Sequence, residues 1–338
     1  MGKEYSETAA DTSGSDRQPA GEFRAHRLQL PAEAAGLRLD QALARALPQY
    51  SRARLQRWIE ADLVQVDGRN LRAKDKVLGG EQVHLTAHFE ADDRVTPEPL
   101  HLSVVYRDEA LIVIDKPAGL VVHPGAGNPR HTLQNALLAL DPELARVPRA
   151  GLVHRLDKDT SGLLVVARTP QSHARLVSVL AAREIERIYM AICTGVMTGG
   201  GTVEAPIGRH RTQRTRMAVR EDGREAITHY RIVERFRAHT LARVQLETGR
   251  THQIRVHLAH AGYPVVGDPV YGGRRRLPAG CGAGLAAELT AFARQALHAA
   301  RLALEHPLTG RACEWESPLP QDMRGLVAAL RADHHDSA

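Results

Sequence analysis

An aspartate within a dense polar segment is the first residue whose setting suggests chemistry. Asp157 lies in HRLDKDTSG, residues 154–162, immediately before the apolar run that begins at Leu163. An ionised carboxylate in such a place could act as a nucleophile or stabilise a developing charge. The alternative is a solvated turn that leads into a strand, because charged residues and glycine are also typical of turns.

A second segment supplies a cation that could serve this carboxylate. In GRTHQIRVH, residues 249–257, helical spacing puts Ile254 and Leu258 on one inward-facing stripe. Arg255 follows Ile254 at about 100° around the helix, at the edge of that stripe. Its guanidinium could reach a buried acid, because a carboxylate is its natural partner. The alternative is an exposed basic helix.

A tyrosine in a strand-like segment could complete a pocket. Tyr189 lies in RIYMA, residues 187–191, where a side chain on one face could line a cavity. The alternative is ordinary packing in the core or on the surface.

The elements expected around these residues are short strands and a few helices. Thr169-Pro170 predicts a helix start, because a capping residue precedes proline at the first helical position. A second helix is expected over 251–261, ending at Gly262. Because short strands outnumber helices and many joins are tight, the pattern predicts an α+β fold, a mixed and largely antiparallel sheet with flanking helices. The expected strands cover residues 102–106, 111–114, 163–166, 188–193, 227–233 and 241–246.

The composition along the chain predicts two domains. Residues 1–24 are polar and are expected to be a disordered tail. A small α/β domain is expected over 25–87, and a proline-bearing linker over 88–100. The larger domain then covers 101–331, and a polar tail follows at 332–338.

Two helices and two strands are expected in the small domain. Residues 39–47 carry leucine at every fourth position, which predicts an amphipathic helix ended by Pro48. Ser51 can cap a second helix. LVQVDG at 63–68 predicts a strand running into a turn, and residues 83–85 predict a closing strand.

The charge balance suits a polyanionic partner without proving one. Lys plus Arg number 45 against 39 Asp plus Glu, a formal charge of +6 with a pI near 9.5. Two sets of arginines are candidates for RNA contact, and the alternative for each is an ordinary solvated surface. They are Arg52, Arg54 and Arg57 in the small domain, and Arg209, Arg211 and Arg214 in a basic loop of the large one.

Several other classes of protein lack support in the sequence. The three cysteines are far apart, which indicates a reducing compartment and neither a disulfide framework nor a cysteine zinc site. The GAG at 125–127 has no third glycine of a dinucleotide loop, and neither a P-loop nor HExxH occurs. No metal or cofactor is expected. No apolar run has membrane-spanning length and no signal peptide is visible, so a cytoplasmic location is expected.

Five segments in this order resemble the RluA-type family of RNA pseudouridine synthases. They are KPAGLVVHP at 116–124, HRLDKDTSG at 154–162, RIY at 187–189, RTHQIRVHL at 250–258 and GDPVYG at 267–272. VHPGAGNP at 122–129 is most similar to the D-type branch, which acts on 23S ribosomal RNA. The small domain resembles the S4-type RNA-binding domain. Together the resemblances cover residues 36 to 331.

The resemblance implies a role for each residue. Asp157 would be the catalytic aspartate, and Arg255 would pair with it. Arg155 would fill the space left by a flipped uridine. Tyr189 would stack on the base, and Ile254 would pack against it. The expected partner is ribosomal RNA or the pre-ribosomal large subunit, bound by a monomer.

The implied reaction explains why these residue types are needed. The bond from the sugar to a ring nitrogen breaks, the base turns, and it rejoins through a ring carbon, so no cofactor is required. Burial would raise the pKa of the catalytic carboxyl, and an adjacent arginine opposes that change. Leu156, Tyr189 and Ile254 would enclose the base and exclude water. Attack on the sugar, attack on the ring and removal of a sugar proton all remain open for Asp157.

Two other functions compete with this one. A non-catalytic ribosome-assembly factor would also use a separate basic domain. A glycosidase would also need carboxylates near a glycosidic bond, usually as a pair, and Asp159 is the nearest second acid.

Overall fold

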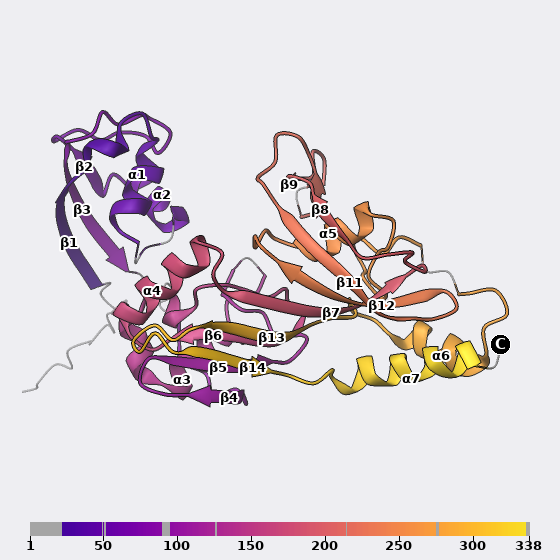
Figure 1. Cartoon of the computed structure of the whole chain (residues 1–338). Coiled ribbons are helices and arrows are strands. Elements are labelled where there is room, and N and C mark those ends of the chain that lie inside the picture. Colours follow the sequence, from indigo (N-terminus) through magenta and orange to yellow (C-terminus); the bar gives the residue numbers. More distant parts are fainter. Residues whose placement is uncertain are drawn as a thin grey trace, which may run out of the picture. The chain divides into compact units, whose positions relative to one another are not determined.

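The computed structural model describes residues 22–48, 50, 52–89, 95–125, 127–213, 215–274 and 277–335. The chain divides into two compact units, residues 1–95 and 96–338 (Figure 1). The linker expected over 88–100 spans this division, although strand β3 occupies its first two residues. Each unit has a hydrophobic core of its own.

The first unit is a three-stranded antiparallel sheet with two helices packed beside it. The sheet order is β1 (Glu22–Gln29), β3 (Gln82–Phe89) and β2 (Val64–Val66). A short turn of 3-10 helix, Ala32–Ala34, precedes α1 (Leu39–Ala46), which ends before Pro48 as predicted. Helix α2 covers Arg52–Glu60, and its predicted cap, Ser51, lies outside the described residues.

Strand β1 differs from the prediction, because Glu22 to Arg24 belong to it and not to a disordered tail. The described residues 25–29 alternate between exposed and half-buried, so the strand has no strong apolar run of its own. It is held by pairing with β3 along its whole length. The local composition of this segment does not predict a strand, because the segment becomes a strand only through its long-range pairing with β3. Residues 1–21 of the expected tail lie outside the described residues.

A buried aspartate joins the two helices of the first unit. Asp40 is fully buried and accepts hydrogen bonds from Arg52 at 2.7 and 2.9 Å, and from Arg38 and Gln56. Burial alone would raise the pKa of Asp40, but these hydrogen bonds outweigh it and lower the pKa. The charge pair fixes the start of α2 against α1.

The second unit is built on a nine-stranded mixed sheet. The order is β4-β5-β6-β13-β7-β12-β11-β8, with β14 pairing the outer part of β13. Among the described pairs of this sheet only β6 with β13 is parallel, which confirms the predicted α+β class. The strands are β4 (Ser103–Arg107), β5 (Leu111–Lys116), β6 (Ser161–Ala167), β7 (Glu186–Thr194), β8 (Gly201–Glu204), β11 (Ile227–Arg235), β12 (His239–Leu246), β13 (Leu297–Glu305) and β14 (Ala312–Glu316).

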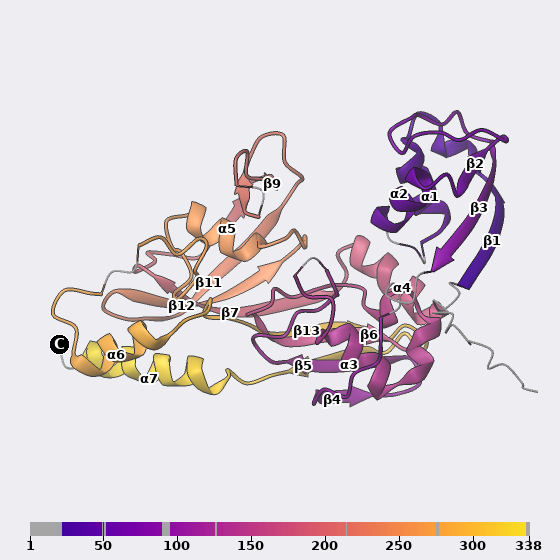
Figure 2. The ribbon, with the colours of Figure 1, turned by 180° about the vertical axis from the view of Figure 1, so that it is seen from behind.

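Helices cover parts of this sheet. Helix α4 packs on β6, and α6 packs against α7, as two opposite views show (Figures 1 and 2). Helix α4 starts as predicted, because Thr169 Oγ1 accepts the N–H of Ser172 at 3.1 Å. The last helix reaches His335, four residues into the expected polar tail. The helices are α3 (Leu133–Leu140), the 3-10 segments Pro142–Arg146 and Pro148–Gly151, α4 (Pro170–Ala181), α5 (Gln253–His260), α6 (Ala283–Ala291) and α7 (Gln321–His335).

The core of the second unit lies around β5 and β6. Every residue of β6 is buried, and so is all of β5 except Asp115. Each fully buried Leu, Ile or Val side chain contributes roughly 1.5–3 kcal/mol relative to exposure. This rigid centre fixes the backbone from which the polar loop before β6 leaves. None of the helices in the described residues has the length and apolar character needed to cross a membrane.

Candidate active site

Three separate elements bring the predicted residues together. Asp157 lies in the loop that enters β6, Tyr189 lies within β7, and Arg255 lies in the first turn of α5. Strand β13 separates β6 from β7 and holds them in one sheet. The loop, the strand and the helix therefore meet over one part of the sheet.

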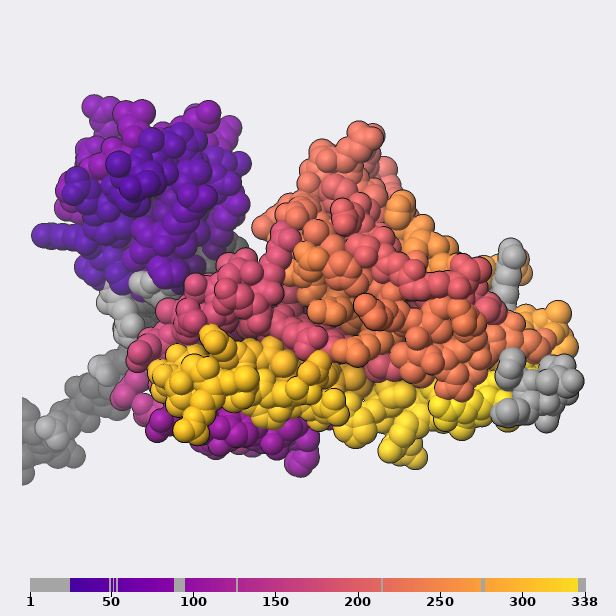
Figure 3. Space-filling view, viewed as in Figure 1, coloured from indigo at the N-terminus to yellow at the C-terminus, as the bar shows by residue number. Residues whose placement is uncertain are grey.

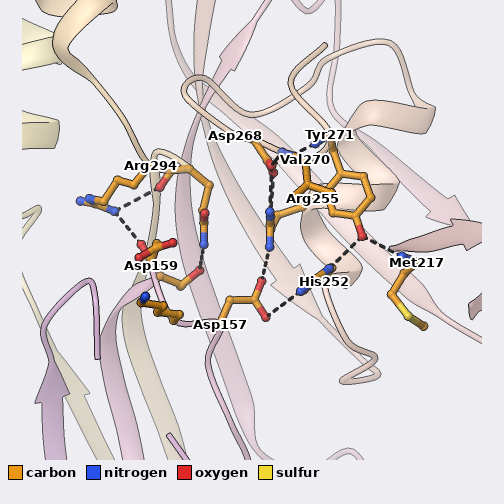
Figure 4. Close-up of polar contacts among 12 residues, drawn as sticks. Asp157, Asp159, Met217, His252, Arg255, Asp268, Val270, Tyr271 and Arg294 are labelled. Carbon is orange, nitrogen blue, oxygen red and sulfur yellow. Dashed lines mark hydrogen bonds and ion pairs between the residues drawn. The ribbon is translucent and has the colours of Figure 1, made fainter. Parts of the chain in front are cut away.

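The carboxylate and the guanidinium form a direct ion pair. Arg255 Nη1 donates to Asp157 Oδ2 at 3.0 Å (Figure 4). The Asp157 side chain is 17% exposed and that of Arg255 only 5%, so neither group faces open solvent. The structure thus contains the contact expected from the sequence, between residues 98 positions apart.

A second carboxylate holds the other edge of the guanidinium. Arg255 Nε and Nη2 donate to the two oxygens of Asp268 at 2.7 and 2.8 Å. Burial alone would lower the pKa of Arg255, but Asp268 and Asp157 raise it above its usual value. Burial likewise favours a higher pKa for Asp268, and Arg255 lowers it. The guanidinium therefore stays charged and is fixed between two carboxylates.

A tight turn places Asp268. Gly267 has φ 73°, and a Cβ there would lie 2.2 Å from the carbonyl oxygen of Arg294. Asp268 Oδ1 accepts the backbone N–H groups of Val270 and Tyr271 at 2.8 and 3.0 Å. Because glycine lets the chain turn at 267, the Asp268 carboxylate is both tied to its own turn and aimed at Arg255.

A histidine and a tyrosine complete the polar side of the site. His252 Nδ1 lies 2.8 Å from the Tyr271 hydroxyl, and His252 Nε2 lies 3.9 Å from Asp157 Oδ1 (Figure 4). The Tyr271 oxygen also accepts the N–H of Met217 at 2.9 Å. Burial lowers the pKa of His252, and the charge of Asp157 opposes this shift. His252 therefore links Tyr271 to the polar side of the site.

Asp157, His252 and Arg255 line a cavity of about 540 Å³. Leu156, Tyr189 and Ile254 line it and are 4%, 6% and 4% exposed. Arg155 also lines it but is exposed. Burial raises the pKa of Tyr189, so its hydroxyl is protonated at neutral pH. The volume falls within the usual range for small-molecule sites and can receive a single nucleoside.

A buried lysine supports the loop that carries Asp157. Lys116 is fully buried, and its Nζ donates to the carbonyl oxygens of Pro117, Leu120 and Lys158 at 2.7, 3.0 and 3.0 Å. Burial lowers the pKa of Lys116 to about 7. The three hydrogen bonds tie residues 117–120 to the backbone next to Asp157, which explains why a lysine stands at this buried position.

The arginines expected to contact RNA lie elsewhere. Arg209 and Arg211 are exposed and belong to or follow β9 (Ile207–Arg209), which pairs with β10 (Met217–Val219). This hairpin projects from the second unit in the space-filling view (Figure 3). Arg214 lies outside the described residues. Arg52, Arg54 and Arg57 are on α2 of the first unit.

Sequence reasoning gave no role to Lys116, His252, Asp268 or Tyr271. Each lies within a segment that carried the resemblance, and that was the available signal. No group of three or more potential metal-ligating side chains is found in the described part of the chain.

The site thus consists of an Asp–Arg pair beside a cavity that can receive a nucleoside, on a mixed sheet. Consistent with this, the family described as RNA pseudouridylate synthase matches residues 110–260, and that described as S4 domain matches residues 37–83. The chain is 55% identical over 305 residues to the ribosomal large subunit pseudouridine synthase D of Pseudomonas aeruginosa, covering 90% of this chain and 95% of that one. The chain therefore belongs to the RNA pseudouridylate synthase family, and it contains an S4 domain.

Other relatives and solved structures agree. The protein of the same name from Escherichia coli K12 is 54% identical over 317 residues, covering 92% of this chain and 97% of that protein. Human RNA Pseudouridylate Synthase Domain Containing 4 has a TM-score of 0.54 at 27% identity, covering 68% of this chain and 93% of that one. Human RNA Pseudouridylate Synthase Domain Containing 1 has a TM-score of 0.51 at 25% identity, covering 70% and 96%. Both resemblances seen in the sequence are confirmed.

Proposed function

We propose that this enzyme isomerises specific uridines of 23S ribosomal RNA to pseudouridine, with Asp157 as the catalytic carboxylate. The observation that carries the proposal is the Asp157–Arg255 pair in a cavity that the apolar side chains of Leu156 and Ile254 also line. The relatives named ribosomal large subunit pseudouridine synthase D supply the substrate class. Ribosomal RNA as substrate implies a cytoplasmic location, and we expect the enzyme to act as a monomer.

The reaction requires an ionised carboxylate and groups that hold it in position. The carboxylate of Asp157 must be ionised for attack on the sugar, attack on the ring or removal of a sugar proton. Arg255 orients it and compensates for its partial loss of hydration. Asp268 in turn fixes Arg255, so the guanidinium does not have to reorganise when RNA binds. No atom enters or leaves the nucleotide, so the pocket has only to hold and turn the base.

The apolar wall retains the detached base. A uracil extruded from its stack would lie between Leu156, Tyr189 and Ile254, with water excluded. Extruding a base from its stack costs a few kcal/mol, and this cost is lowest in loops of the RNA. Arg155, exposed at the cavity, is placed to occupy the vacated stack and offset part of that cost.

RNA contacts outside the cavity come from the two sets of arginines. Arg52, Arg54 and Arg57 lie on α2 within the S4 match, where a structured RNA would be held. Arg52 also binds Asp40, so its charge is partly balanced within the domain. Arg209, Arg211 and Arg214 would contact phosphates from the β9–β10 hairpin, which positions the strand without reading its sequence.

The Asp157→Asn variant tests the proposal in cells. Pseudouridine should disappear from the target positions of 23S ribosomal RNA when this variant replaces the wild-type protein, because the amide carries no negative charge. Asp159→Asn is a matched control, since Asp159 does not line the cavity, and it should retain modification. Unchanged modification with Asp157→Asn would reject the catalytic role. Rescue of every assembly defect by that variant would instead favour the non-catalytic alternative, and release of free uracil would favour a glycosidase.

A further inference from the structure

Arg187 is a buried cation that the catalytic scheme does not use. It is 6% exposed and lines the cavity. Its one described side-chain hydrogen bond runs from Nη2 to the backbone carbonyl of Glu247 at a long 3.3 Å, and Nε is buried without a partner. No described carboxylate pairs with it. A buried charge without an ionic partner is costly, so such a group calls for a ligand.

The strand directs Arg187 to the same side as Tyr189. Residues two apart on a strand share a face, and both side chains line the cavity. Along β7 the two positions are about 6.6 Å apart. Arg187 and Tyr189 are therefore neighbours on the same face of β7, and both side chains line the cavity.

The loop that contains Gly249 and Arg250 packs closely against Arg187. A Cβ on Gly249 would lie 3.0 Å from Arg187 Nη1, so the glycine lets this loop pass over the guanidinium. Arg250 follows in the same loop, lines the cavity and donates from Nε only to a backbone carbonyl, that of Glu225. Two cations without carboxylate partners therefore face one wall.

The nearby acids are already occupied. Glu247 binds Arg183 and His229, at 3.1 and 2.7 Å. Glu225 binds Arg183 at 2.8 Å. The three arginines Arg183, Arg187 and Arg250 carry three positive charges against the two negative charges of Glu225 and Glu247, which leaves one positive charge in excess.

We infer that Arg187, with Arg250, binds a backbone phosphate of the RNA strand next to the flipped nucleotide. This rests on the proposed function, because it assigns the strand's path through the same cavity. A phosphate supplies the missing negative charge and accepts from a planar guanidinium in two directions. A uracil carbonyl would leave the buried charge unbalanced.

The test compares Arg187→Met with wild type in binding to transcribed 23S ribosomal RNA over a series of KCl concentrations. Loss of a charge-assisted contact should weaken binding about tenfold to a hundredfold. The plot of log affinity against log salt should become flatter by about 0.7–0.9, the effect of one phosphate contact. The melting temperature without RNA should stay equal or rise, because Met fills the space without a buried charge. Arg187→Lys should recover most of the salt dependence.

Arg301→Met is the matched control. Arg301 is bound to Glu186 and Glu314 on neighbouring strands, so its loss should lower the melting temperature and leave the salt dependence of RNA binding unchanged. Three results for Arg187→Met would each overturn the inference. They are an unchanged RNA affinity, a weaker affinity with an unchanged salt dependence, and a weaker affinity with a parallel fall in the melting temperature. The affinity and its salt dependence are read without detecting product, so a failure of this inference is distinguishable from a failure of the proposed function. That function fails separately, if the wild-type protein forms no pseudouridine in the same RNA.

Discussion

At the scale of single residues, the site is organised around one guanidinium. Arg255 joins Asp157, 98 positions away, to Asp268, 13 positions away. The first contact was predicted from the family resemblance of the two segments, because their residue pattern alone also allowed a solvated turn and an exposed basic helix. The second contact could not be predicted, because it depends on how the turn at Gly267 aims a side chain. His252 and Lys116 were missed for the same reason: their partners are a tyrosine hydroxyl and backbone carbonyls that only the fold brings near.

Replacing Asp268 by asparagine should impair both catalysis and stability. The amide cannot balance the buried charge of Arg255, and it accepts only one of the two hydrogen bonds. We expect the single-turnover rate of pseudouridine formation to fall about tenfold or more, because a misplaced guanidinium misplaces Asp157. The free energy of unfolding should fall by roughly 3 kcal/mol, typical of breaking a buried ion pair.

Rapid quenching with RNA and urea denaturation give the two quantities. RNA affinity should change little, because Asp268 does not line the cavity. A variant with full rate and normal stability would show that Arg255 is held well enough without Asp268.

At the scale of elements, the strands next to the site were predictable and the strand between them was not. β6 contains two Leu and two Val, β7 contains two Ile and a Tyr, and both strands were expected from the sequence. β13 reads LHAARLALE, whose Ala, Leu and Arg favour a helix. It becomes a strand because it is paired on both sides, by β6 and β7, so tertiary context overrides local preference.

The parallel contact of β6 with β13 should be sensitive to substitution at its glycine. Gly162 has φ 112°, and a Cβ there would lie 2.3 Å from the carbonyl oxygen of Ala299. Gly162→Ala should therefore separate the strands and shift the loop carrying Asp157. We expect a loss of roughly 2–4 kcal/mol in unfolding free energy, together with loss of activity.

Gly199→Ala is the control for that change. Gly199 has open space around its Cβ position and no positive φ, so the variant should keep normal stability. Thermal unfolding of both proteins measures the difference. Equal melting temperatures would mean that β13 moves aside without cost.

At the scale of the whole molecule, stability should depend on half-buried histidines whose pKa is lowered. His154 Nε2 accepts the N–H of Val165 at 3.1 Å, which requires an unprotonated nitrogen. Burial lowers the pKa of His154 to about 3, and that of His123 to about 4. Both rings take up a proton more readily in the unfolded chain, where the pKa is about 6.5.

Stability contributed by these rings is therefore complete above pH 6.5 and is lost as the pH falls towards 4 or 3. Each such histidine should cost about 1–2 kcal/mol of unfolding free energy between pH 7 and 5. Urea titrations at the two pH values measure this loss, and His154→Gln, which keeps an acceptor but does not titrate, should show a smaller one. An equal loss in the variant would exclude His154 as a source.

The two units contain different functional parts of the protein. The S4 match lies in the first unit, whereas every residue of the cavity lies in the second. The proposed RNA contacts come from both units, whereas the proposed catalytic residues all lie in the second. The most direct measurement is single-turnover pseudouridine formation by purified Asp157→Asn on transcribed 23S ribosomal RNA, with RNA affinity measured in parallel. We expect near-normal RNA affinity and no detectable pseudouridine. Product formed at a rate close to that of the wild type would contradict this expectation.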